Sequence, residues 1–116
     1  MKYLVFVEDA TSLRQIEELL TATSLPYETV SLENLLEKGR TDAFTAVVTE
    51  YETWQRHASI LRYFDCLESL NQKPFLVFNK FKRQNALKLR RVKGQTVHSP
   101  LPAQIKDVQP LLLQLG

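Results

Sequence analysis

Short apolar runs alternate with amphipathic stretches along this chain of 116 residues. The first run, Tyr3 to Val7, does not alternate between polar and apolar positions, which is typical of a strand buried on both faces. Further strands are predicted over residues 27–31, 44–49, 75–78 and 95–98. Helices are predicted after a cap at Thr11 or Ser12, and over about 32–39, 52–71, 81–92 and 102–115.

This regular alternation of strand and helix predicts the α/β class. We expect a three-layer αβα sandwich with a five-stranded parallel sheet in the order 2-1-3-4-5, the flavodoxin-like or CheY-like layout. The strand at 27–31 is the most polar and is expected at an edge of the sheet. Pro110 lies inside the last helical pattern and should kink that helix or end it early. The length predicts a single domain over residues 1–116.

The composition is that of an ordinary globular protein, with 44% hydrophobic and 24% charged residues. The single cysteine, Cys66, excludes an internal disulfide and fits a reducing compartment. His57 and His98 have no metal-ligand spacing with Cys66 or with each other, and we expect them to be ordinary residues. The apolar run before Glu8 is too short for a signal peptide or a membrane span, so a cytoplasmic location is predicted.

Charge is distributed unevenly along the chain. The net charge is +2, but residues 1–68 carry 12 acidic and 6 Lys or Arg residues, whereas residues 69–116 carry one acidic residue and 9 Lys or Arg residues. Most of the excess positive charge lies between residues 80 and 93. The basic residues of this segment are Lys80, Lys82, Arg83, Lys88, Arg90, Arg91 and Lys93. Such a segment predicts a binding face for an acidic protein surface or for nucleic-acid phosphates.

Two adjacent acids, Glu8 and Asp9, follow the first strand directly. In open α/β sheets the functional crevice lies beyond the carboxyl ends of the strands, so the two acids are candidate site residues. Neighbouring carboxylates repel each other and need a cation or hydrogen-bond donors. The alternative is a solvated turn in which Asp9 caps the next helix.

The segment Leu-Val-Phe-Val-Glu8-Asp9-Ala-Thr-Ser-Leu-Arg resembles the first motif of response-regulator receiver domains, the family of CheY. The segment Ser99-Pro100-Leu-Pro-Ala-Gln-Ile is similar to the Lys-Pro-Phe segment of that family. The spacing agrees to within a few residues, and the resemblance covers the whole chain. It implies a degenerate receiver, or pseudo-receiver, of two-component signal transduction.

The resemblance places a phospho-acceptor pocket at the ends of the strands, but the pocket is incomplete. Glu8 and Asp9 match the metal-binding acid pair, Glu50 stands at the position of the phospho-accepting Asp, and a slip of one residue would put Thr49 there. Asn79 replaces the usual Thr or Ser, and Ser99 replaces the Lys. No Asp occupies the acceptor position, which argues against efficient phosphorylation. No cofactor is expected with certainty, although Glu8, Asp9 and Glu50 could bind Mg²⁺ weakly.

These features predict a non-enzymatic, stand-alone receiver that binds partner proteins without phosphorylation. The expected partner is a signalling protein with an acidic surface, and a homodimer through the fourth helix, fifth strand and last helix is a further expectation. Two alternatives stay open: an Mg²⁺-dependent receiver with an unusual acceptor, and a nucleic-acid-binding domain that uses the basic segment 80–93. No membrane contact is expected.

Overall fold

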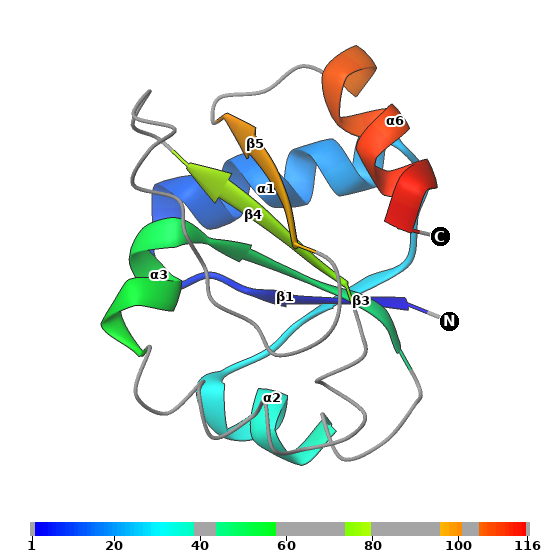
Figure 1. Cartoon of the computed structure of the whole chain (residues 1–116). Helices are drawn as coiled ribbons and strands as arrows, with labels where there is room; N and C mark the ends of the chain where they lie inside the picture. Colours follow the sequence, from blue (N-terminus) through cyan, green and yellow to red (C-terminus); the bar gives the residue numbers. More distant parts are fainter. Residues whose placement is uncertain (1, 39–43, 58–73, 80–95, 101–104, 116) are drawn as a thin grey trace.

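A computed structural model describes residues 2–38, 44–57, 74–79, 96–100 and 105–115 (Figure 1). The strands are β1 (Lys2–Phe6), β2 (Tyr27–Thr29), β3 (Phe44–Glu50), β4 (Phe75–Asn79) and β5 (Thr96–Pro100). The helices are α1 (Ala10–Ala22), α2 (Leu32–Lys38), α3 (Tyr51–Arg56) and α6 (Ile105–Leu115). Strand and helix therefore alternate as the hydrophobic pattern predicts.

All paired strands in the described part of the chain run parallel. The sheet has the order β2-β1-β3-β4, with β5 paired along the outer side of β4. Leu4 of β1 lies opposite Glu28 of β2 on one side and Val47 of β3 on the other. The predicted parallel α/β sheet and the order of its first four strands are confirmed. The polar strand β2 lies at an edge, as expected, but it is shorter than predicted because it ends at Thr29.

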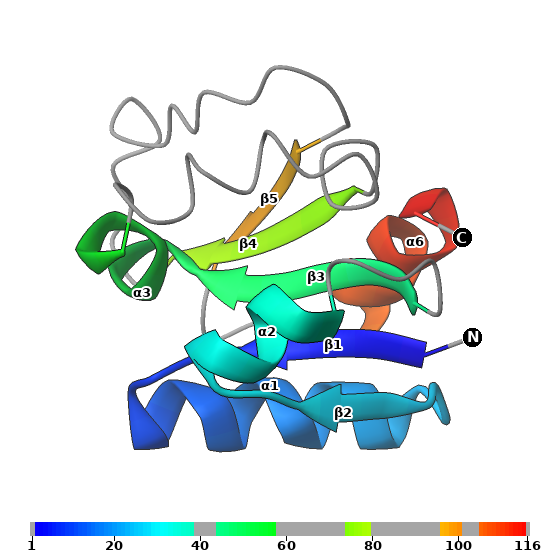
Figure 2. The ribbon, with the colours of Figure 1, turned by 90° about the horizontal axis from the view of Figure 1, so that it is seen from below.

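Helices cover both faces of the sheet (Figures 1 and 2). On one face α1 and α6 pack against a core in which Val5, Val48 and Phe78 are buried. On the other face α2 and α3 contribute Leu35 and Trp54 to a second buried cluster. Consecutive strand residues point to opposite faces, which explains why uniformly apolar strands are needed in the middle of three layers.

The first helix begins and ends with local hydrogen bonds. Asp9 is its N-cap, so the predicted caps Thr11 and Ser12 are wrong and the alternative role of Asp9 is confirmed. At the other end Ser24 has φ 59°, the left-handed region in which glycine is usual. The N–H of Ser24 donates to the carbonyl of Thr21 (3.0 Å), and the N–H of Leu25 donates to that of Leu20 (3.3 Å). This pair of bonds is a Schellman motif, which ends the helix and turns the chain toward β2.

Two helix predictions differ from the structure. The helix expected over 52–71 ends at Arg56, and His57 is its C-cap with φ −110° and ψ 18°, so one continuous helix is wrong. The His57 ring contacts Glu8, which follows β1, at 2.7 Å. Of the two outcomes predicted for Pro110, an early end of the last helix is wrong, because α6 continues to Leu115, and a kink at Pro110 stays a prediction. The helix predicted over 81–92 lies outside the described residues.

Among the residues that the structure describes, no helix is both long and apolar enough to cross a membrane.

Candidate functional site

The residues predicted to form a pocket all lie at the carboxyl edge of the sheet. Glu8 and Asp9 join β1 to α1, Glu50 and Asn79 end β3 and β4, and Ser99 is the fourth residue of β5. Glu50 lies opposite Phe78, and Phe78 lies opposite Ser99, so Glu50 and Ser99 share one row of the sheet. The five residues are thus neighbours in the fold, as the topology predicts.

Strand alternation nevertheless divides this group between the two faces of the sheet. Glu50 is two residues after Val48, which packs in the α1 and α6 core, and therefore belongs to that face. Asn79 is two residues after Val77, which packs in the opposite core with Trp54, and belongs to the face of α2 and α3. By this alternation Glu50 and Asn79 belong to opposite faces of the sheet.

Glu8 is bound to α3 through both its backbone and its side chain. Its N–H donates to Thr53 Oγ1 at 3.1 Å. Its Oε1 accepts from Arg56 Nη1 at 2.9 Å and contacts His57 Nε2 at 2.7 Å. Desolvation acts to raise the pKa of the Glu8 carboxyl, but the contacts with His57 and Arg56 outweigh it and hold this pKa below its usual value. The first acid of the pair is therefore neutralised by the chain itself.

Asp9 is engaged at the start of α1. Its Oδ2 accepts from the backbone N–H of Ser12 at 2.9 Å and from the Ser12 hydroxyl at 2.8 Å. Ser12 is fully buried, so its hydroxyl depends on this partner within the protein. The carboxylate also satisfies an N–H of the first helical turn that has no partner within the helix.

The other three predicted residues are buried. Glu50 is 1% exposed, and Asn79 and Ser99 are also almost inaccessible to solvent. Glu50 is in addition the N-cap residue of α3, although its side chain makes no cap hydrogen bond. Neighbouring Thr49, the alternative acceptor, donates its hydroxyl to the carbonyl of Phe6 at 2.7 Å. Neither side chain is exposed to a dissolved phosphodonor.

The carboxylates do not form a metal-binding group. Within the described ranges, no three Asp, Glu, His or Cys side chains come together in an arrangement that could hold a metal ion. Glu8 points to Arg56 and His57, and Asp9 points to Ser12. A divalent cation at this edge would have to displace these donors and would meet the guanidinium of Arg56, so the residues present do not fit a Mg²⁺ site.

The predicted basic face lies outside the residues that the structure describes. Lys80 and the basic residues between 82 and 93 lie outside the described residues. The same is true of Cys66, and the side chain of His98 is not described although its backbone belongs to β5.

Sequence reasoning misses the residues that hold Glu8. The hydrophobic pattern places Thr53 and Arg56 in a helix but not in the site, and His57 is expected to be an ordinary residue. Their spacing of i, i+3 and i+4 places the three residues on one side of a helix, and this is the signal that could group them. Nothing in the sequence links that side of the helix to Glu8.

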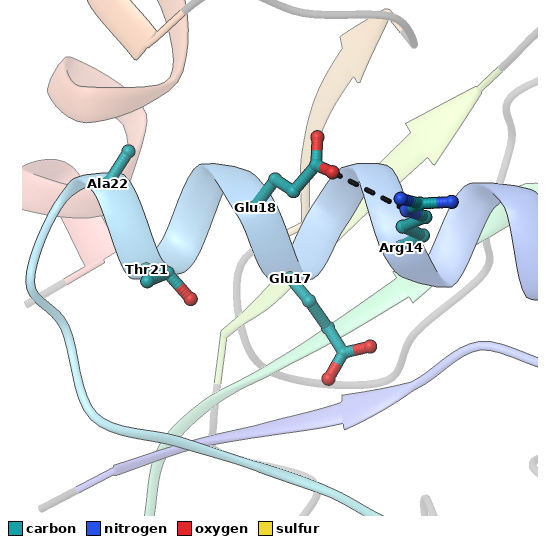
Figure 3. Close-up of a pocket in the computed structure, with 5 residues that line it drawn as sticks. All are labelled: Arg14, Glu17, Glu18, Thr21 and Ala22. Carbon is teal, nitrogen blue, oxygen red and sulfur yellow. Dashed lines mark ion pairs between the residues drawn. The ribbon is translucent and has the colours of Figure 1, made fainter.

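An open hollow also lies along α1 (Figure 3). It is lined by Arg14, Glu17, Glu18, Thr21 and Ala22, and Arg14 pairs with Glu18 at 3.6 Å. All five belong to one helix, so this is a surface groove of α1 and offers no enclosed site.

Comparisons of the chain with protein-family models, curated proteins and solved structures found no match.

Proposed function

We propose that this chain is a receiver-like module, with a CheY-like fold, that binds a partner protein in a signalling pathway without being phosphorylated. The parallel sheet, the order of its strands and the acids at its carboxyl edge support the receiver-like layout. The proposed partner has an acidic surface, because the second half of the chain carries the excess of Lys and Arg.

The observation that carries this proposal is the engagement of Glu8 by Arg56 and His57. Phosphorylation of a receiver requires a reactive carboxylate, a divalent cation that neutralises the phosphoryl oxygens, and a cation that pairs with the product. The carboxylate of Glu8 is bound by Arg56 and His57, which leaves it poorly placed to bind a cation. Glu50, at the acceptor position, is only 1% exposed, and Ser99 has no charge to pair with a phosphoryl group. Each of the three requirements is therefore poorly met.

The competing proposal is an Mg²⁺-dependent receiver that uses Glu50 as acceptor. An amide NMR titration with Mg²⁺, followed by beryllofluoride as a mimic of the phosphoryl group, separates the two. We expect no shift at Glu8, Asp9 or Glu50 in either step. A phosphorylatable receiver in the same buffer serves as the positive control for both reagents. Shifts at the three acids with Mg²⁺ that spread further with beryllofluoride would overturn the proposal.

Nucleic-acid binding by the segment 80–93 is a separate alternative that has only the sequence in its favour. A titration with a duplex DNA and with a single-stranded RNA at two salt concentrations tests it. Binding that weakens steeply with salt would support this alternative. Under the proposal, neither nucleic acid binds at physiological salt.

A further inference from the structure

Arg56 and His57 already hold a carboxylate, that of Glu8. Arg56 Nη1 lies 2.9 Å and His57 Nε2 2.7 Å from the same oxygen, Oε1. Two nitrogen groups from consecutive residues thus converge on one carboxylate oxygen, an arrangement that we name the Arg56–His57 fork. Its occupant in the folded chain identifies the chemistry that it recognises.

The fork is held in place by the core behind it. The His57 ring packs on Phe6, with ring centroids 5.7 Å apart, and Phe6 is only 2% exposed. The backbone N–H of His57 donates to the carbonyls of Thr53 and Trp54 at 3.3 and 3.2 Å. The position of the His57 ring is fixed before a ligand binds. Binding of a carboxylate therefore costs less conformational entropy than it would with a mobile ring.

A carboxylate from solution can replace Glu8 in the fork, because both partners of the ion pair are accessible to solvent. The Arg56 side chain is 60% exposed and the Glu8 side chain is 36% exposed. An ion pair that is this exposed contributes at most about 1 kcal/mol, because water competes for both charges. The guanidinium also has five N–H groups in total, so it can bind a second carboxylate in a bidentate manner.

We propose that the Arg56–His57 fork is the contact point for an acidic segment of the partner protein, and that Glu8 is a built-in competitor that occupies the fork in the unbound chain. This inference rests on the proposed function, since the fork would be the place where the acidic partner protein binds. Binding then exchanges one carboxylate for another at the carboxyl edge of the sheet. The affinity of the fork is reduced by the fraction of molecules in which Glu8 occupies it.

The experiment follows a hexaglutamate peptide by NMR of the full chain, with the Arg56 Nε–H group and the amides of Thr53 and His57 as reporters. Glu8→Gln removes the competing charge while keeping the shape of the side chain, and we expect it to bind the peptide about fivefold more tightly than the wild type at these reporters. Adding Arg56→Gln to Glu8→Gln should abolish these shifts.

Glu18→Gln is the matched control, because Glu18 is an exposed acid of α1 that pairs with Arg14 (Figure 3). It changes the net charge by the same amount but should leave peptide affinity at the reporters unchanged. Equal gains in Glu8→Gln and Glu18→Gln would overturn the inference, as would peptide shifts that stay in the segment 80–93 in every variant. Neither result would contradict the proposed function. That proposal is tested separately, by the titrations with Mg²⁺, beryllofluoride and nucleic acids.

Discussion

The backbone N–H of Glu8 donates to Thr53 Oγ1 over 3.1 Å, although the two residues are 45 positions apart in the chain. Four residues before Thr53, the hydroxyl of Thr49 donates to the carbonyl of Phe6. Two threonine hydroxyls, one at each side of the junction between β3 and α3, thus bind the backbone at the last residue of β1 and just after it. The position of Glu8 beside Arg56 and His57 follows from this attachment.

Thr53→Val should destabilise the protein by about 1–3 kcal/mol. Valine keeps the shape of threonine but removes the acceptor for the Glu8 N–H, and a polar group left without its partner in a partly buried place costs this much. Urea denaturation monitored by circular dichroism measures the loss. Thr21→Val, on the exposed side of α1, is the control and should change the free energy of unfolding by no more than about 0.5 kcal/mol. Equal losses in both variants would contradict the role given to Thr53.

Asp9→Ala should destabilise the protein by about 1 kcal/mol, whereas Asp9→Asn should leave its stability nearly unchanged. Asparagine can still accept the hydrogen bonds from Ser12, but alanine cannot. Denaturant midpoints of the two variants, measured at neutral pH without divalent cations, test this. A large loss in Asp9→Asn would show that the charge of Asp9 matters beyond capping.

Ser24→Gly should stabilise the protein by about 1 kcal/mol. Ser24 has φ 59°, which costs a residue with a Cβ atom about 1–2 kcal/mol and costs glycine little, although the greater freedom of glycine in the unfolded chain offsets part of the gain. Thermal or urea unfolding measures the change. The matched substitution Thr21→Gly, inside α1, should instead destabilise slightly, by about 0.3–0.5 kcal/mol, because glycine is a poorer helix former than threonine. A loss of stability in Ser24→Gly would argue against the left-handed turn.

Acid should weaken the attachment of Glu8 to α3. The pKa of the Glu8 carboxyl is lowered in the folded chain, so its contribution is fully present above the ordinary Glu pKa and is lost as the pH falls through the lower, folded value. The wild type and Glu8→Gln should therefore differ in stability at neutral pH and converge as the pH falls below that folded value. Their urea midpoints, compared at each pH, measure this.

Glu28→Gln is the comparison for that pH series. The pKa of Glu28, in the edge strand β2, is also lowered, first by its contact with Lys38 and then by Lys2. The stability difference between the wild type and Glu28→Gln should therefore also shrink as the pH falls. A stability difference between wild type and Glu8→Gln that grows as the pH falls would contradict the lowered pKa of Glu8.

The sequence by itself determined the local features and the layout of the sheet. The apolar residues 3–6 and 44–48 lie in strands buried on both faces, because such runs cannot be exposed without large cost. The alternation of strand and helix favoured a parallel sheet, and parallel strands bring their carboxyl ends together. The order of residues along the chain was therefore enough to assign Glu8, Glu50 and Ser99 to one edge of the sheet.

Only the tertiary structure decided what those residues contact. Glu8 binds Arg56 and His57, which lie 48 and 49 positions further along the chain, and Asp9 turns to Ser12 instead of sharing a cation with Glu8. Periodicity describes which face of an element is apolar, but it carries no information on how an element docks at the end of a distant strand. The docking of α3 beside β1 depends on side-chain contacts between segments far apart in sequence, and only the folded chain brings these segments together.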